Sequence, residues 1–147
     1  MNVATNLEAS ASYFPQQPAL SEAGSAISYG ALNERVNHIA TGLVNMGIKP
    51  GEHVGICAPN SSDWIAFYFG VLKTGAVAVT YSSLLSKDEL TLLVDHSKPK
   101  FIFTSDDKIS VLDGMKGSAG LEKIICQNGD INIQQIVDAG SASFKAV

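Results

Sequence analysis

The sequence is poor in charged residues. Asp, Glu, Lys and Arg make up 16% of its 147 residues, below the roughly 25% usual in soluble domains, whereas 46% of the residues are hydrophobic. This balance excludes an intrinsically disordered chain and predicts a folded one. The net charge of −4 and the lack of any Lys/Arg cluster provide no positive surface for a phosphate backbone, so we expect no nucleic-acid partner.

The chain also has few cysteines and no long hydrophobic run. Cys57 and Cys126 lie far apart without CxxC spacing, which indicates reduced core thiols rather than a disulfide framework or a zinc site. The most apolar stretch, 64–81, is interrupted at 73–75, so no run reaches the roughly 20 residues of a membrane span. Residues 1–15 lack the features of a secretory signal. We therefore expect a cytoplasmic protein with no transmembrane segment.

Histidines and acidic pairs give little sign of catalysis. The three histidines, at 38, 53 and 96, have no partner at metal-binding spacing and no nucleophile motif beside them, so we predict no metal site and no catalytic residue. Asp106 and Asp107 follow a predicted strand, where ligands of α/β proteins often bind, but loop caps are the favoured interpretation.

The first 46 residues predict two helices and a hairpin. Residues 3–14 have apolar positions at helical spacing before Pro15, and 19–21 and 26–28 flank a turn-prone segment, 22–25. A second helix follows from residue 29, with Ser28 as its N-cap and Gly47 at its end. Its apolar stripe is Leu32, Val36, Ile39, Ala40, Leu43 and Met46, and its polar residues Asn33, Glu34, Arg35 and Asn37 are expected to face elsewhere.

Short apolar strands then alternate with helices. Strands are predicted at 53–58, 76–80, 101–104 and 124–126. Helices are predicted around 64–72, after a Ser86/Glu89 capping box with Leu90, Leu93 and Val94 buried, and at 133–137. Alternation of this kind implies parallel βαβ units, and so an α/β fold with a doubly wound, mostly parallel sheet flanked by helices.

The same pattern divides the chain into three parts. Residues 1–28 form a helix and small hairpin, and 29–139 form the βα units. Residues 140–147, which begin with the Gly/Ser-richer stretch 140–143, are expected to be a truncated linker between domains. The aromatic residues Trp64, Phe67, Tyr68 and Phe69 are candidates for an acyl-binding wall, but their helical spacing favours core packing.

Four segments carry a resemblance to a known family. Residues 27–32 resemble the early "(T/S)Y..L" motif of the adenylate-forming superfamily, and 46–54 its "GvkpGDrV" turn and strand, with Glu52 in the usual Asp place. Residues 58–61 match its "pNs" turn and 72–77 its "lkaGAv" segment, whereas Thr80 and Tyr81 depart from the usual pattern. The chain thus resembles the N-terminal segment of an AMP-forming acyl-CoA synthetase, or fatty-acid CoA ligase.

The resemblance implies an N-terminal subdomain of the adenylate-forming fold. It also implies a parent enzyme that joins a carboxylic acid, fatty or otherwise apolar, to CoA with ATP and Mg²⁺, releasing AMP and pyrophosphate. The partners would be the rest of the same polypeptide and a small carboxylic acid. A homo-oligomer and a peripheral membrane association of the full-length enzyme stay open.

The residues that such chemistry needs are not found in this sequence. Phosphates are held by Gly-rich backbone nests, cationic side chains and magnesium, and the glycines at 114, 117, 120 and 129 form no phosphate-loop pattern. We therefore expect this chain alone to be catalytically inert and to bind no cofactor.

One loop has a predicted role by position alone. In acetyl-CoA-type relatives the loop after the Gly-Ala-Val strand lies near the CoA channel, which makes Ser82 and Ser83 the candidate cofactor-binding residues. Two other interpretations compete with the ligase scaffold: a noncatalytic interaction module of the same fold, and the start of a nonribosomal-peptide adenylation domain.

Overall fold

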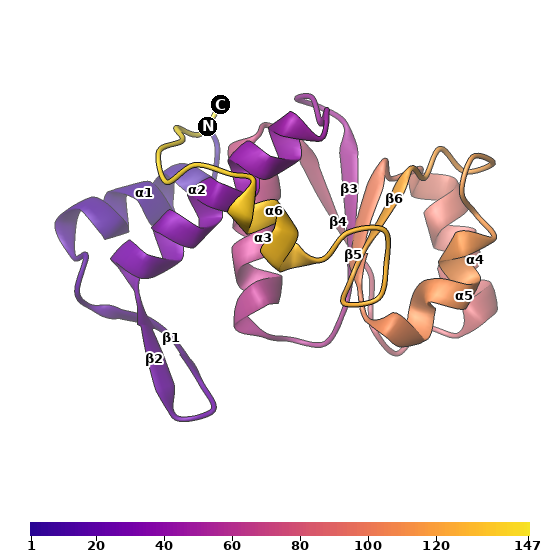
Figure 1. Ribbon diagram of the computed structural model, residues 1–147, viewed down its shortest axis with the longest axis horizontal. Helices are drawn as coiled ribbons and strands as arrows, with labels where there is room; N and C mark the ends of the chain where they lie inside the picture. Colours follow the sequence, from indigo (N-terminus) through magenta and orange to yellow (C-terminus); the bar gives the residue numbers. More distant parts are fainter.

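A four-stranded parallel sheet forms the centre of the molecule. The computed structural model describes all 147 residues, and Figure 1 shows helices on both sides of the sheet. The strands lie in the order β4 (Val77–Thr80), β3 (His53–Cys57), β5 (Phe101–Thr104), β6 (Lys123–Ile125), and every neighbouring pair is parallel. The chain runs from β3 to β4 and then crosses back to β5, so the predicted doubly wound sheet is confirmed.

A helix and a hairpin precede the sheet, as predicted. α1 (Ala4–Tyr13) is followed by β1 (Pro18–Glu22) and β2 (Ser25–Ser28), which pair antiparallel and project from the body in Figure 1. Ala23 and Gly24 both have positive φ, 49° and 80°, as a tight hairpin turn requires. The predicted apolar positions of α1 were Val3, Leu7, Ala11 and Phe14; Leu7 is buried as predicted, whereas Val3 and Phe14, at the two ends, are exposed.

Three helices cover one face of the sheet. α2 (Tyr29–Asn45), α3 (Ser62–Lys73) and α6 (Ile133–Asp138) pack here together with α1. We call the cluster on this face the larger core; its sixteen buried residues are Leu7, Leu32, Val36, Ile39, Leu43, Ile48, Val54, Ile56, Ala66, Phe67, Val71, Ala76, Phe101, Phe103, Ile125 and Ile136.

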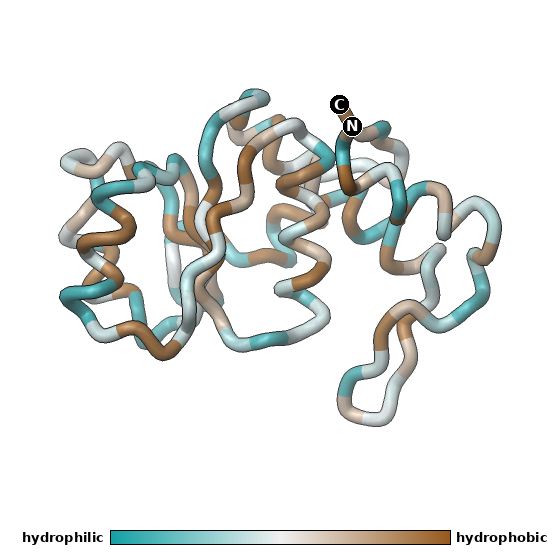
Figure 2. The backbone as a smooth tube through the Cα atoms, turned by 180° about the vertical axis from the view of Figure 1, so that it is seen from behind, coloured by the Kyte–Doolittle hydropathy of each residue, from teal (hydrophilic) through white to brown (hydrophobic).

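The opposite face is covered by α4 (Lys87–Ser97) and α5 (Ile109–Asp113), which follows a 3-10 turn at Asp106–Lys108. The cluster on this face, the smaller core, has eleven buried residues: Cys57, Tyr81, Leu90, Val94, Ile102, Leu112, Met115, Ala119, Leu121, Ile124 and Cys126. Alternate residues of each strand enter the two cores, which is why the strands are continuous apolar runs. Figure 2 shows the hydrophobic positions gathered in the body, with the hairpin tip pale or hydrophilic.

Side-chain caps fix the starts of α2, α3 and α4, of which those at Ser28 and Ser86 were predicted and that at Ser61 was not. Ser28 and Ser61 accept hydrogen bonds from the main-chain N–H groups of Ala31 and Trp64, at 3.2 and 3.0 Å. The Ser86/Glu89 capping box is present at α4. Each cap satisfies a helix N–H group that has no partner within the helix. No helix in the structure has the length and hydrophobicity needed to cross a membrane.

Two predicted orientations are wrong. Leu93 is 41% exposed, because α4 already covers the sheet with Leu90 and Val94. Asn37 was expected to face away from the core, but it is buried at 7% exposure, since it binds the ammonium of Lys73. A polar residue of a helix can therefore be buried when a polar side chain of another helix forms a hydrogen bond with it.

Candidate functional site

The carboxyl edge of the sheet is the first place to look for a ligand site, because α/β proteins bind ligands where the strand order reverses. That reversal lies between β3 and β5. There the Thr104 hydroxyl donates a hydrogen bond to the main-chain oxygen of Cys57 at 2.7 Å, which joins the ends of the two strands. Loops that begin at residues 58, 81 and 105 leave from this edge.

The loop after β4 carries both serines predicted from the sequence. Tyr81 anchors it, with its main-chain N–H donating to the Ile56 oxygen at 2.8 Å and its hydroxyl bonded to Ser97. Ser82 is exposed, and its hydroxyl accepts a hydrogen bond from the N–H of Leu84 at 3.2 Å. Ser83 is half-buried. The structure therefore places both serines on one surface loop at the carboxyl edge, and their binding role stays a prediction.

The acidic pair at the end of β5 stabilises loops. Asp106 accepts hydrogen bonds from the main-chain N–H and the side-chain amide of Asn128, and these bonds lower the pKa of its carboxyl. Asp107 accepts a hydrogen bond from the Ser105 hydroxyl and forms an ion pair with Lys108 at 3.3 Å. The sequence favoured caps for the following helix, which is wrong: neither the 3-10 turn nor α5 has a side-chain cap, because Asp106 binds Asn128 in a distant loop and Asp107 binds Ser105 and Lys108.

The charged side chains at the end of β5 are mostly acidic. They include the two exposed carboxylates Asp106 and Asp107, and the nearby Lys108 is already paired with Asp107. A triphosphate needs unpaired cations and converging N–H groups instead. No group of three or more potential metal ligands is found in the structure.

The three histidines come from three elements, α2, β3 and α4. His38 is bonded through Nδ1 to the Val137 oxygen at 3.0 Å, and His53 to the Ser97 oxygen at 2.7 Å. His96 is exposed on α4. Two of the three thus have structural partners, in line with the interpretation made from the sequence.

Both cysteines are buried free thiols, as predicted. Burial raises the pKa of Cys57. Burial, followed by the hydrogen bond and charge of Asp106, raises the pKa of Cys126 to about 11. Such thiols are poor nucleophiles at neutral pH, since the thiolate is the reactive form.

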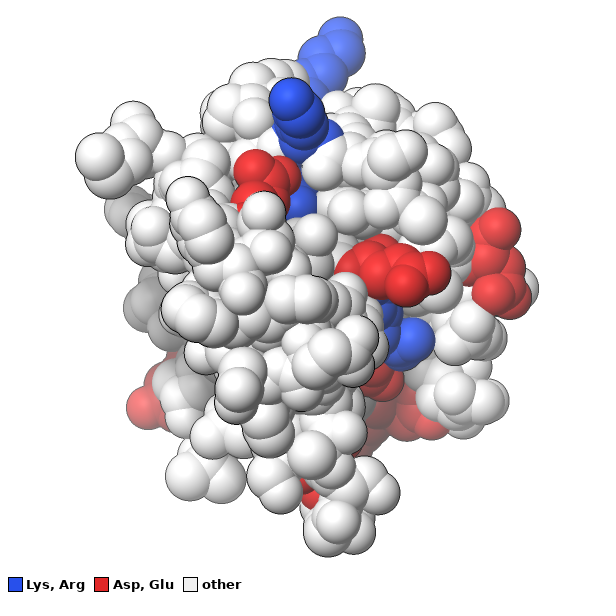
Figure 3. All heavy atoms as spheres, turned by 90° about the vertical axis from the view of Figure 1, so that its left-hand side faces the viewer, with Lys and Arg blue, Asp and Glu red and all other residues white.

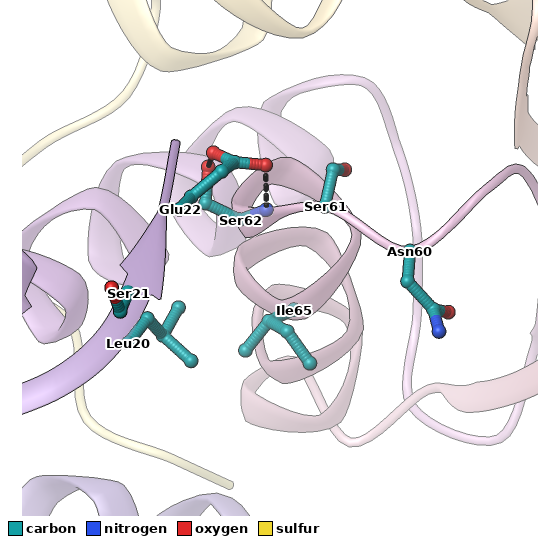
Figure 4. A pocket seen from close by; sticks show the side chains of 7 residues that line it. All are labelled: Leu20, Ser21, Glu22, Asn60, Ser61, Ser62 and Ile65. Carbon is teal, nitrogen blue, oxygen red and sulfur yellow. Dashed lines mark hydrogen bonds between the residues drawn. The ribbon is translucent and has the colours of Figure 1, made fainter. Parts of the chain in front are cut away.

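A pocket that the sequence did not suggest lies between the hairpin and the start of α3. Its volume is about 260 Å³, and Figure 4 shows Glu22 reaching across it to α3. The Glu22 carboxylate accepts hydrogen bonds from the main-chain N–H of Ser62 at 3.0 Å and from its hydroxyl, and these bonds lower the pKa of Glu22. The contact joins residues 40 positions apart, so no local sequence signal could have revealed it.

A second, more apolar pocket lies among α1, the hairpin, α2 and α3. It has a volume of about 330 Å³, and its apolar lining includes Leu7, Leu20, Ile65 and Phe69. Of the aromatic residues considered for an acyl-binding wall, only Phe69 lines this pocket. Phe67 is fully buried and stacks on Phe103 at a ring-centroid distance of 4.9 Å, so core packing explains it. The pocket could hold a hydrocarbon group, and its lining contains no Asp, Glu, His, Cys, Lys or Arg.

Comparisons with known proteins agree on one family. The family model "AMP-binding enzyme" matches residues 7–145. Among curated proteins, a linear gramicidin synthase of Brevibacillus parabrevis is 31% identical over 104 residues, which is 71% of this chain and 1% of that protein. A medium/long-chain-fatty-acid–CoA/3-oxocholest-4-en-26-oate–CoA ligase of Mycolicibacterium smegmatis is 25% identical over 141 residues, or 96% of this chain and 24% of the ligase.

Solved structures of CoA ligases share the fold. The anthranilate CoA ligase AuaEII in complex with anthranoyl-AMP superposes with a TM-score of 0.91 at 20% identity, covering 100% of this chain and 30% of the ligase. A long-chain-fatty-acid-CoA ligase of Archaeoglobus fulgidus gives a TM-score of 0.88 at 22% identity, covering 100% and 32%. The chain spans about a quarter to a third of the length of these CoA ligases. It belongs to the family of AMP-binding enzymes, with the fold of the N-terminal domain of adenylate-forming ligases.

Proposed function

We propose that this chain is the N-terminal scaffold of an ATP-dependent, AMP-forming acid–thiol ligase. The reaction joins a carboxylic acid to CoA and releases AMP and pyrophosphate, and we propose a fatty or other apolar acid as the substrate. The observation that carries this proposal is the family match over residues 7–145 of a chain that spans only 24% of a related fatty-acid–CoA ligase.

We assign the chemistry to parts of the enzyme outside these residues. The charges at the carboxyl edge support this assignment, because Asp106 and Asp107 would repel a triphosphate. Losing even one preorganised donor to the transition state costs about a hundredfold in rate. The isolated chain should therefore form no acyl-AMP from ATP, Mg²⁺ and a fatty acid.

A chimaera tests the scaffold role directly. Residues 1–147 would replace the corresponding N-terminal segment of the Mycolicibacterium smegmatis ligase, and acyl-AMP and acyl-CoA formation would be measured with a fatty acid. We expect ligase activity from the chimaera and none from residues 1–147 alone. A folded but inactive chimaera, or acyl-AMP formed by the isolated chain, would contradict the proposal.

The CoA role of Ser82 and Ser83 has its own test. In the active chimaera, Ser83→Trp should raise the KM for CoA and leave the KM for ATP unchanged. Ser110→Trp, at an exposed serine of α5, is the matched control and should change neither constant. If the KM for CoA is the same in both variants, the loop has no role in CoA binding and only connects β4 to α4.

A peptide-synthetase adenylation domain is the second candidate. It is favoured by the 31% identity to the linear gramicidin synthase, which exceeds the 25% identity to the fatty-acid–CoA ligase. Replacing the matching segment of that synthase by residues 1–147 and measuring amino-acid-dependent pyrophosphate exchange distinguishes the two. Activity in this chimaera alone would favour the peptide synthetase.

A further inference from the structure

A fully buried lysine links three helices on the larger-core side. Lys73, the last residue of α3, has 0% exposure, and its ammonium donates hydrogen bonds to Glu8 Oε1 at 2.8 Å, Asn33 Oδ1 at 2.9 Å and Asn37 Oδ1 at 2.6 Å. An ammonium has three hydrogens to donate, and all three are used here. Because an unpaired buried charge is very costly, this arrangement fixes the positions of all three acceptors.

The same groups also hold the C-terminal segment. Glu8 Oε1 accepts a hydrogen bond from the N–H of Ala146 at 2.9 Å, and the Asn37 amide donates to the oxygen of Ala142 at 2.7 Å. The main-chain oxygen of Lys73 accepts from the N–H of Val147 at 3.0 Å. Lys73 thus orients the side chains that contact residues 141–147 and contacts the segment itself.

A further hydrogen bond to this segment also involves its main chain. The amide of Asn2 donates to the oxygen of Val147 at 2.9 Å. The side chains of the segment itself take no part in these bonds, and residues 141–143 are exposed. The hydrogen bonds that join the segment to this face are therefore made to its backbone groups, whereas the side chains of Phe144 and Ala146 are half-buried.

The path of the segment is fixed where it enters. A Cβ atom on Gly140 would lie 1.9 Å from the main-chain oxygen of His38, so only glycine fits between α6 and α2 there. Beyond this point the segment has no helix or strand bonds of its own, and it crosses α2 to end beside the N-terminus (Figure 1). Figure 3, which views this end of the molecule, shows a mostly uncharged surface with few acidic or basic side chains.

We propose that α1, α2 and α3 form a binding site for an extended peptide backbone, which residues 141–147 occupy, and that Lys73 is its positioning residue. The segment can leave this site without unfolding either core, because none of its residues belongs to the larger or the smaller core.

Amide hydrogen exchange of the full chain, followed by NMR, tests the proposal. In the wild-type protein the amides of Ala146 and Val147 should exchange at least about tenfold more slowly than in an unstructured peptide. In Lys73→Met, exchange of the Ala146 amide should accelerate by about tenfold or more and approach the peptide rate, while the amides of β3 and β5 stay protected. Lys116→Met is the matched control, because it removes a different paired ammonium, which is bound to Asp113 and Asp130. The exchange rate of the Ala146 amide in this variant should stay within about twofold of the wild-type rate.

A milder variant covers the case in which Lys73→Met does not fold. Asn2→Asp keeps the oxygen that caps the N–H of Ala4 but loses the amide that donates to the oxygens of Leu72 and Val147. It should accelerate exchange at Val147 without affecting β3. The proposal would be overturned if the amides of Ala146 and Val147 exchanged as fast in the wild type as in an unstructured peptide. It would also be overturned if either variant accelerated amide exchange in residues 141–147 and in β3 and β5 by the same factor.

Discussion

The larger and smaller cores pack on opposite faces of the same four strands, yet only the larger core adjoins a buried charge. The smaller core comes almost entirely from the continuous stretch 79–126 and contains aliphatic side chains, an aromatic ring and two thiols. The larger core combines residues as distant as Leu7 and Ile136, and beside it Lys73 joins α1, α2 and α3. The difference shows that polar residues are used here where segments remote in sequence must be held together.

Removing the ring of Phe67 from the larger core should cause the largest loss of stability. Phe67→Ala removes a fully buried ring that stacks on Phe103, and should lower the free energy of unfolding by about 3–5 kcal/mol. Leu92→Ala, at a 69% exposed position of α4, should change it by less than about 0.5 kcal/mol. Urea unfolding at pH 7 measures both. A loss below about 1 kcal/mol for Phe67→Ala would mean that the larger core is loosely packed.

The thiols of the smaller core should be protected from alkylation. With the pKa of Cys126 at about 11 and that of Cys57 also raised, the thiolate fraction at pH 8 is far below that of a free cysteine. We expect iodoacetamide to react about a hundredfold more slowly with the native chain than with the urea-unfolded chain at the same pH. Mass spectrometry of time points gives both rates, and similar rates would show that the smaller core opens readily.

Substitutions at two glycines compare how tightly the helices pack on the two faces of the sheet. A Cβ on Gly42 of α2 would lie 2.5 Å from the main-chain oxygen of Ile136, so Gly42→Ala should lower the free energy of unfolding by about 1–3 kcal/mol. Gly114, after α5, has helical φ and ψ and a nearest neighbour at 3.6 Å. Gly114→Ala should be neutral or stabilise by about 0.4–1 kcal/mol. Thermal unfolding of the two variants is the check; equal shifts would argue against tight packing of α6 on α2.

The smallest expected effect on the free energy of unfolding comes from the ion pair between Glu8 and Lys73, and it depends on pH. Burial raises the pKa of Glu8, but hydrogen bonds from Lys73 and Ala146 and the charges of Lys73 and Lys145 outweigh it, so the pKa lies below its ordinary value of 4.5. The stabilisation that comes with this depressed pKa is therefore complete above about pH 4.5 and is lost as the pH falls through the folded-state value. Glu8→Gln should be less stable than the wild type at pH 7 by about 0.5–1 kcal/mol. The difference should vanish in acid, as measured by urea unfolding from pH 3 to 7, and a difference that is the same at every pH would exclude an ionic origin.

Local patterns predicted most of the fold. Helix starts were identified at Ser28 and Ser86 because capping depends on residues within one turn, and the strands because their apolar runs are short and bounded by turn residues. The orientations of Asn37 and Leu93 were wrong because they depend on what another helix offers to a given face. The candidate site was predicted less well: the binding role of Ser82 and Ser83 stays a prediction, and the Glu22 pocket was missed because it depends on a contact across 40 residues.

The sequence by itself determined the alternation of strands and helices, their caps and the family, because each of these features depends on residues that are close together along the chain. Only the tertiary structure decided the role of Lys73, which interrupts an apolar run in the sequence. A lysine at such a position is ordinarily exposed, and its burial became possible only because Glu8, Asn33 and Asn37 converge on it from two other helices. The same convergence holds residues 141–147 in place, although the sequence predicted a linker between domains there.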